Sequence, residues 1–277
     1  MAQDIADFAS LSWPCAPAAV LDTLTRWSAF CFLLDDALDD EHSLDRSGQR
    51  ATLTAHVEEV RNHEQPSKRP PLAATSGGPF VAAFSDVWAP LAASMDRAWQ
   101  VRFTGHCLAY LQATAQEAHH RETGCTPAVG AYLQLRRHSS GSLPHLDLIE
   151  YATARPRPHD MLAGAAVRNA TDAAADLAAW DNDQASLAKE LEAGEIHNLI
   201  VLTAREHACS HRQAQHLVAE RLHQRQSEFE TATRVLSSRG GHRGREYAQA
   251  LRAWLDGIRT WNARAHRYQP RPADAVR

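Results

Sequence analysis

Apolar residues recur along most of the chain at the three- and four-residue spacing of amphipathic helices. Ala, Leu, Arg, Glu and Gln dominate these stretches, and runs in which apolar and polar residues alternate are absent. Two helices are expected from "HLDLIEYATA" and from "CSHRQAQ", where Ser210 is a suitable N-cap. The pattern predicts further helices over 17–39, 45–62, 79–95, 97–121, 127–137, 173–207 and 246–267.

Segments rich in Pro, Gly and Ser separate these helices. "EQPSKRPPLAATSGGPF" is predicted to be a surface loop, and "HSSGSLP" and "RPRPHD" to be helix breaks. "SSRGGHRG", ahead of the last helix, is predicted to be a flexible loop that could order over a site. Neither an internal repeat nor an interdomain linker is recognisable. The chain is therefore predicted to be a single all-α domain over 1–277, with 269–277 as a tail.

Composition narrows the class of protein. Hydrophobic residues make up 44% of the 277, enough for a sizeable core, and a net charge of -4 argues against a nucleic-acid partner. The five cysteines are scattered without a CxxC pair, which favours a reducing compartment over disulfides or zinc. The acidic start "MAQDIADFAS" lacks the apolar core of a signal peptide, and no apolar run approaches the ~18 residues of a membrane span. We therefore expect a cytoplasmic protein.

An acidic cluster, "FCFLLDDALDDEHS", ends the first predicted helix. Asp35, Asp36 and Asp39 share a stripe with Phe32, because neighbours on a helix face are three and four residues apart. Together with Asp40 these carboxylates repel one another unless a cation takes up their charge. The cluster is either the rim of a pocket with an aromatic floor or a solvated helix end, and this stretch alone favours neither.

A second polar stripe lies in "WDNDQASLAKELEAGEIHNLI". Asn182, Ser186 and Glu190 are four residues apart and therefore fall on one face of a helix. They offer an amide, a hydroxyl and a carboxylate oxygen, ligands that suit magnesium rather than zinc. Such a stripe is usually an exposed face, but Leu187, Leu191 and the following "NLIVL" indicate a largely buried helix. The stripe therefore points to a function.

Together the two stretches resemble the motifs of class I terpene synthases (terpene cyclases) of bacteria. The family's DDxxD motif matches 35–39, and its NDxxSxxxE triad matches 182–190. "YLQLRRHSSG" resembles the segment that carries the family's diphosphate-sensing arginine, here Arg136, 46 residues before the triad asparagine. "WNARAHRYQP" resembles the C-terminal Arg-Tyr pair, Arg267 and Tyr268, and the order of motifs agrees across roughly residues 11–270.

The resemblance implies a helical bundle around a central active-site cavity. It implies magnesium-dependent ionisation of an allylic prenyl diphosphate, farnesyl diphosphate first and geranylgeranyl diphosphate next, and cyclisation to a terpene hydrocarbon or alcohol. Three Mg²⁺ ions are expected, with ligands among Asp35, Asp36, Asp39, Asn182, Ser186 and Glu190. The expected diphosphate contacts are Arg136, Lys189, Arg267 and Tyr268.

The resemblance also assigns a helix break and a cavity wall. Ser139 stands where the family often has a linking Asp or Thr, and the carbonyl of Ser140 takes the place of the break's effector group. Phe32, Phe103 and Trp261 are the candidates for aromatic walls that stabilise a carbocation, although core packing is the alternative for each.

Other features are interpreted without a catalytic role, and two rival functions stay open. His119, His120, His207 and His211 are interpreted as surface histidines. The family usually has some tens more residues ahead of DDxxD, so we expect an outer helix to be missing or truncated. The rivals are a chain-elongating prenyltransferase, which needs a second aspartate-rich motif, and an inactive diphosphate-binding helical protein. A homodimer is one option for the assembly.

Overall fold

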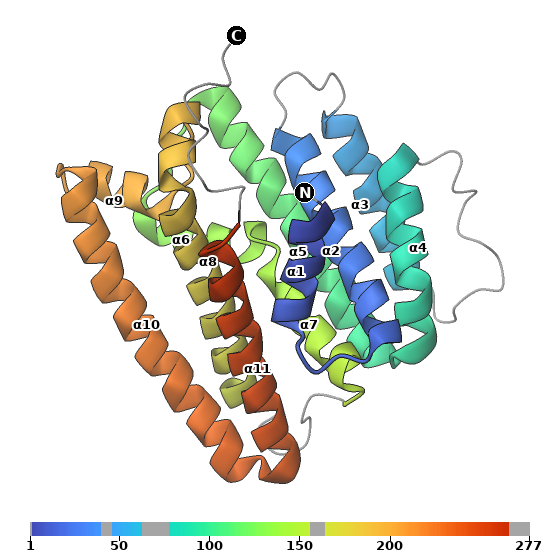
Figure 1. The fold of residues 1–277 in the computed structure, drawn as a ribbon. Coiled ribbons are helices and arrows are strands. Elements are labelled where there is room, and N and C mark those ends of the chain that lie inside the picture. Colours follow the sequence, from blue (N-terminus) through green and yellow to red (C-terminus); the bar gives the residue numbers. More distant parts are fainter. Residues whose placement is uncertain (1, 40–45, 63–77, 156–163, 266–277) are drawn as a thin grey trace.

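Every regular element in the computed structural model, which describes residues 2–39, 46–62, 78–155 and 164–265, is an α-helix (Figure 1). The all-α prediction is therefore confirmed for these residues. The helices are α1 Ala2–Ser12, α2 Ala18–Asp39, α3 Arg46–Asn62, α4 Gly78–Ser94, α5 Arg97–Thr123, α6 Val129–Ser139, α7 Ser142–Thr153, α8 Ala165–Ala193, α9 Leu199–Glu206, α10 His211–Arg239 and α11 Gly241–Asn262.

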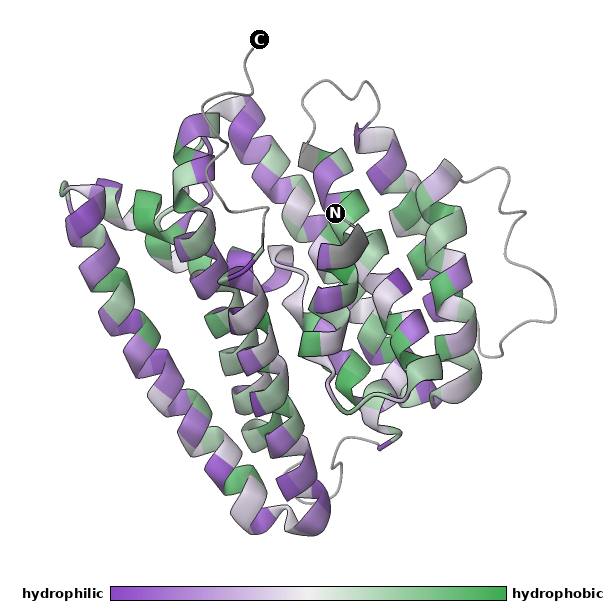
Figure 2. Cartoon of the chain, viewed as in Figure 1, coloured by the Kyte–Doolittle hydropathy of each residue, from purple (hydrophilic) through white to green (hydrophobic). Residues whose placement is uncertain are grey.

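Three long helices form one side of the bundle. α8 packs on α10 and α11, and these two also contact each other, so the three run side by side in Figure 1. Ala173, Ala174 and Ala175 of α8 are fully buried. Because alanine has a strong helix propensity and a small side chain, the neighbouring helices can approach closely. The hydropathy of α10 alternates between polar and apolar stripes, as Figure 2 shows, which fits a helix at the edge of the bundle.

Aromatic side chains hold the other side of the bundle together. α2 packs on α4, and α3 packs on α5. Trp27 of α2 contacts Phe103 of α5 at 5.0 Å between ring centroids, and Phe103 stacks on Trp99 at 4.7 Å. Aromatic pairs at this spacing add to the stabilisation that burial provides. This cluster fixes how α2, which ends in the acidic motif, stands relative to α5.

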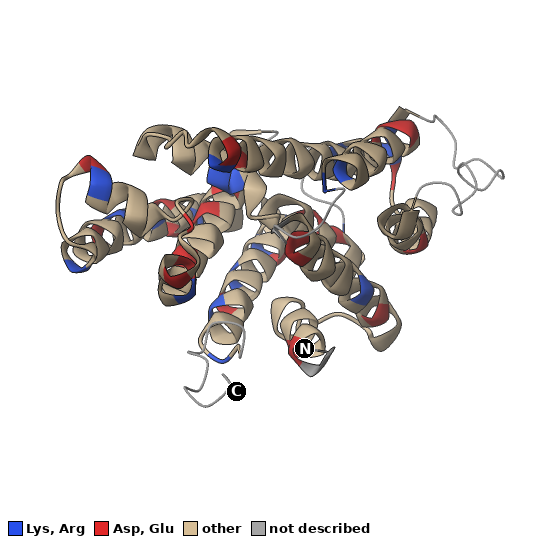
Figure 3. Ribbon diagram, turned by 90° about the horizontal axis from the view of Figure 1, so that it is seen from above, with Lys and Arg blue, Asp and Glu red and all other residues tan. Residues whose placement is uncertain are grey.

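Charges of both signs are distributed over the bundle. Seen from above in Figure 3, acidic and basic residues occur side by side on several helices. In the part of the chain that the structure describes, no helix is both long and apolar enough to cross a membrane.

The N-terminal helix α1 was not predicted from the sequence. It packs against α2 and α11, and its Phe8 is buried between them. Gly257 of α11 lies directly against the backbone of Leu11 and Ser12. A glycine at this position lets the two helices meet backbone to backbone.

The prediction of one helix over 173–207 is wrong. α8 begins earlier, at Ala165, and ends at Ala193, where Gly194 adopts a left-handed conformation (φ 69°) that favours glycine. α9 then starts at Leu199, with the Asn198 side chain accepting hydrogen bonds from the amides of Ile200 and Val201. The break gives the chain a sharp turn directly after the polar stripe of α8.

The prediction of a flexible loop at 237–244 is also wrong, and so is the expected start of the last helix at 246. α10 extends to Arg239 and α11 begins at Gly241, with Gly240 between them. Added Cβ atoms at Gly240 or Gly244 would overlap the carbonyl oxygen of Leu236. The glycines therefore serve a tight helix-to-helix turn. The predicted N-cap at Ser210 is confirmed, with a capping box to Gln213.

Gly257→Ala is expected to destabilise the protein, because the new methyl group would overlap the Leu11 carbonyl and push α1 away from α11. We expect a loss of about 1–3 kcal/mol in the free energy of unfolding, measured by urea denaturation. Gly105→Ala in α5 is the matched control, since nothing lies within 4 Å of its added Cβ. The control should be neutral or stabilising by up to about 1 kcal/mol. Equal stability of the two variants would contradict this packing.

Candidate active site

A cavity of about 810 Å³ lies between the two sides of the bundle. Its polar wall brings together Asp35 from α2, Arg136 from α6, and Asn182, Ser186 and Glu190 from α8. The rest of the lining is largely apolar and aromatic. A cavity of this size, with a few convergent polar groups on an otherwise apolar wall, is typical of small-molecule sites.

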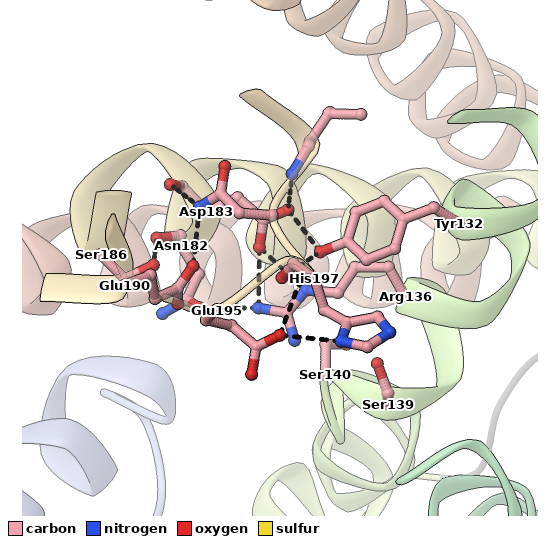
Figure 4. Close-up of polar contacts among 12 residues, drawn as sticks. Tyr132, Arg136, Ser139, Ser140, Asn182, Asp183, Ser186, Glu190, Glu195 and His197 are labelled. Atoms are coloured by element: carbon pink, nitrogen blue, oxygen red, sulfur yellow. Dashed lines mark hydrogen bonds and ion pairs between the residues drawn. The ribbon is translucent and has the colours of Figure 1, made fainter. Parts of the chain in front are cut away.

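The triad of Asn182, Ser186 and Glu190 is fixed on α8 by its own helix and by the break that follows (Figure 4). The Ser186 hydroxyl donates to the backbone carbonyl of Asn182 at 2.8 Å. Glu190 Oε2 accepts a hydrogen bond from Nδ2 of Asn198 at 2.8 Å, and the same amide reaches the Asp183 carbonyl. Asn198 therefore ties the last triad residue to the start of α9.

Arg136 is bound to the triad helix through two neighbouring side chains. Its Nε donates to Asp183 Oδ1 at 2.9 Å, and its Nη2 donates to Asn182 Oδ1 at 2.8 Å. The Asp183 carboxylate is fully buried, and its Oδ2 accepts from the Leu199 amide at 2.9 Å and the Tyr132 hydroxyl at 2.8 Å. Asp183 is thus the anchor of the site. The sequence places Asp183 in the NDxxSxxxE motif but predicts no separate role for it.

The buried charges of this site compensate one another. Burial raises the pKa of Asp183, while Arg136 and the hydrogen bonds from Leu199 and Tyr132 act against that shift. Burial also acts to lower the pKa of Arg136, but Asp183 and other neighbours outweigh it, so the pKa of Arg136 lies well above its usual value. Arg136 is therefore a permanent cation in the cavity wall. Its planar group is suited to diphosphate oxygens.

A second polar network adjoins the first. Glu195 Oε1 accepts from Nδ1 and the amide of His197, each at 2.8 Å, and Oε2 accepts from Arg121 at 2.9 Å. Burial acts to raise the pKa of Glu195, but these partners lower it to about 2. His120 stacks on His197 with 3.2 Å between Nδ1 and Nε2, so the interpretation of His120 as a surface histidine is wrong. In the sequence, nothing indicates this network except that Glu195 and His197 follow shortly after the triad.

The predicted helix break lies at the cavity wall. α6 ends at Ser139, Ser140 caps it, and Gly141 adopts a left-handed conformation (φ 68°) before α7. The buried Ser139 hydroxyl donates to the carboxylate of Glu117. Burial raises the pKa of Glu117. Ser139, Ser140 and Gly141 all line the cavity.

The other predicted polar residues are only partly placed in the site. Asp35 lines the cavity, but Asp36 is exposed and does not. Asp39 is the last residue of α2, and its side chain lies outside the described part of the structure. Lys189 is exposed and lines the cavity. Arg267 and Tyr268 lie outside the described residues.

Two of the three predicted aromatic residues line the cavity. The Phe32 and Trp261 rings are 5.3 Å apart between centroids, and Phe8 of α1 lies 5.2 Å from each. Phe103 is fully buried and does not line the cavity. For Phe103 the structure favours the alternative of core packing, because its ring stacks on Trp99 and Trp88 and contacts Trp27.

The oxygens on the cavity wall fit a hard divalent cation. Among the described residues, no three His, Cys, Asp or Glu side chains gather closely enough to form a metal cage. Asp35, Asn182, Ser186 and Glu190 instead present oxygens from two helices to one cavity. Such an open set is the kind that Mg²⁺ uses when waters and substrate phosphates complete its coordination.

The comparisons with known proteins agree with this arrangement. The model of "Terpene synthase family 2, C-terminal metal binding" matches residues 26–228. An isoafricanol synthase from Streptomyces violaceusniger is 32% identical over 97% of this chain and 73% of its own length. A (-)-delta-cadinene synthase from Streptomyces clavuligerus is 29% identical over 92% of this chain and 79% of its own.

Solved structures agree on the fold. A 2-methylisoborneol synthase from Streptomyces coelicolor, in complex with Mg²⁺ and geranyl-S-thiolodiphosphate, superposes with a TM-score of 0.82. The superposition covers 95% of this chain and 83% of the synthase chain, at 20% sequence identity. The chain therefore belongs to terpene synthase family 2, and it is a class I terpene synthase of the bacterial type.

Asp183→Asn is expected to lower the free energy of unfolding by about 3–5 kcal/mol, because it leaves Arg136 buried without its counter-charge. Thermal or urea denaturation measures the loss. The neighbouring Asp181→Asn is the matched control: Asp181 pairs with Arg259 at 2.7 Å, but their side chains are 23% and 35% exposed. That change should lower the free energy of unfolding by no more than about 1 kcal/mol. If the two variants were equally stable, Asp183 would not be the anchor.

Proposed function

We propose that this protein binds an allylic prenyl diphosphate with Mg²⁺, ionises it, and cyclises the carbocation to a terpene hydrocarbon or alcohol. Farnesyl diphosphate is the first choice of substrate and geranylgeranyl diphosphate the second. The observation that carries the proposal is the single cavity joining Asp35, the triad of α8 and Arg136. Two further findings support it. The relatives are named as synthases of particular terpenes. The 2-methylisoborneol synthase described above was solved with Mg²⁺ and geranyl-S-thiolodiphosphate.

The polar wall would receive the diphosphate. Asn182, Ser186 and Glu190 would hold one Mg²⁺ of three, and Asp35 would contribute to holding the others. When bound, Mg²⁺ supplies Lewis-acid stabilisation of the negative charge that develops on the leaving diphosphate. Arg136 would donate hydrogen bonds to oxygens of the same diphosphate. To do so, its Nη2 would exchange the Asn182 oxygen for a diphosphate oxygen while Nε keeps its bond to Asp183.

The apolar wall would hold and shape the carbocation. Phe8, Phe32 and Trp261 surround one part of the cavity with ring faces and edges. Aromatic faces attract cations by about 0.5–2 kcal/mol each. They also exclude water, which would otherwise add to the cation. Trp261 is held in place by a hydrogen bond from its Nε1 to the Asp4 carbonyl at 2.8 Å.

Incubation of the protein with geranyl, farnesyl and geranylgeranyl diphosphate, with Mg²⁺ and with EDTA, tests the proposal. Mass spectrometry of the organic extract should find cyclic products from one chain length, and none with EDTA. Longer prenyl diphosphates, formed when isopentenyl diphosphate is added, would identify a chain-elongating enzyme. Diphosphate binding without any product would identify an inactive binder.

Asn182→Ala and Glu190→Ala are expected to reduce turnover to background, since each removes a proposed Mg²⁺ ligand. Circular dichroism should stay helical, because neither side chain belongs to the apolar core. Gln184→Ala, an exposed position on the same helix, is the matched control and should retain turnover. Near-normal turnover of either triad variant at low Mg²⁺ would remove the triad from the metal site.

Phe32→Leu and Trp261→Leu are expected to yield more acyclic and partly cyclised products. Each change removes about 0.5–2 kcal/mol of cation stabilisation at a branch point, and about 1.4 kcal/mol is a tenfold change in rate. Gas chromatography of the extracts measures the product ratios. Phe103→Leu is the matched control, because Phe103 packs in the core and does not line the cavity. It should lower stability and leave the product ratios alone. Unchanged ratios in all three variants would leave the rings as packing residues.

A further inference from the structure

His145, in the first turn of α7, is a buried base in the aromatic part of the cavity wall. Its side chain lines the cavity and the residue is only 7% exposed. Trp13 stacks on its ring at 5.8 Å with an interplanar angle of 7°. Phe8 and Trp27 meet it edge-on at 5.6 and 5.9 Å. The polar networks of the site do not include it.

The hydrogen bonding of His145 assigns its tautomer. Nδ1 lies 2.8 Å from the carbonyl oxygen of Gly141, at the helix break. A carbonyl can only accept, so Nδ1 carries the proton, and Nε2 carries the lone pair. Within the described residues, no hydrogen bond is formed to Nε2. The break that orients the diphosphate-binding segment thereby also fixes which nitrogen of His145 is basic.

The surroundings keep this lone pair available. Burial lowers the pKa of His145 to about 4, against a smaller opposing effect of the Gly141 bond, so the ring is neutral near pH 7. A carbocation with an adjacent C–H bond is far more acidic than any imidazolium, so a weak base suffices. Once protonated, the ring would be a cation stacked on the face of Trp13 at 5.8 Å, within the roughly 6 Å range of cation–π attraction.

The position of His145 also suits the proposed cation. Phe8 contacts the rings of His145, Phe32 and Trp261 at 5.2–5.6 Å. His145 therefore belongs to the same aromatic part of the cavity wall as Phe32 and Trp261, the two rings proposed to hold the carbocation. The diphosphate, on the polar wall near Arg136 and the α8 triad, is the competing base.

We propose that Nε2 of His145 accepts the proton in the last step of the reaction. A C–H bond next to the cationic carbon breaks, its electron pair forms the C=C bond of the product, and the proton bonds to Nε2. Where water adds first, the proton comes from the resulting oxonium. The imidazolium then passes its proton to the departing diphosphate or to solvent. This role rests on the proposed function and assigns a base to it.

His145→Asn tests the base directly, because an asparagine amide can still donate to the Gly141 carbonyl but has no basic lone pair. Two readouts are needed: the rate of diphosphate release and the product ratios. Ionisation does not use His145, so release should stay within about threefold of the wild type. The main product should fall at least about a hundredfold relative to the others, the lower end of the range typical of general-base catalysis. Isomers deprotonated elsewhere, or water adducts, should replace it.

His145→Ala separates chemistry from shape. Added imidazole should restore the wild-type product ratios, whereas pyrrole, a ring of the same size without a basic nitrogen, should not. His56→Asn is the matched control: His56 is also buried and bonded, to Ser85 at 2.8 Å, but it does not line the cavity. It should leave both readouts unchanged.

Three results would overturn the assignment. These are unchanged product ratios in His145→Asn, equal rescue of His145→Ala by imidazole and pyrrole, and loss of diphosphate release in a folded His145→Asn. The last would place His145 in an earlier step. If the wild type releases diphosphate from none of the prenyl diphosphates, the proposed function itself fails, and that outcome is distinct from the other three.

Discussion

The buried ion pair between Arg136 and Asp183 is the constraint on which the rest of the site depends. Asp183 of α8 has no exposed surface, so its charge needs partners, and they come from two other helices: Arg136 and Tyr132 on α6, and the Leu199 amide at the start of α9. A buried charge with one partner removed costs about 3–5 kcal/mol. α6, α8 and α9 are thus held in one relative position.

That position determines the chemistry of the cavity wall. Because Asp183 faces Arg136, the adjacent Asn182 meets the same guanidinium. Ser186 and Glu190 follow Asn182 by about one and two turns of α8 and line the same cavity. α6 ends one turn after Arg136, where the break at Ser140 and Gly141 turns the chain into α7 and holds Nδ1 of His145. One buried pair therefore positions the proposed diphosphate contact, the proposed metal ligands and the proposed base.

The sequence predicted what local patterns determine. The polar stripe of α8, the acidic end of α2 and the N-cap at Ser210 follow from helical spacing and capping chemistry, and the structure has them. It did not predict the break at Gly194, because the apolar pattern continues through it. The core position of Phe103 could not be predicted, because helical spacing gives the face on which a residue lies. It does not tell whether that face meets the cavity or the packed core. The roles of Asp183, His120 and His145 depend on partners 50 or more residues away or on the folded cavity.

Calorimetric titration of inorganic diphosphate into the protein tests the central claim, that one polar wall binds Mg²⁺ and diphosphate together through Arg136 and the α8 triad. We expect saturable binding with excess Mg²⁺, little or none in EDTA, and a loss of at least about tenfold in affinity on Arg136→Lys, since lysine cannot make the paired contacts of arginine. Binding of equal strength with Mg²⁺, in EDTA and in Arg136→Lys would contradict it.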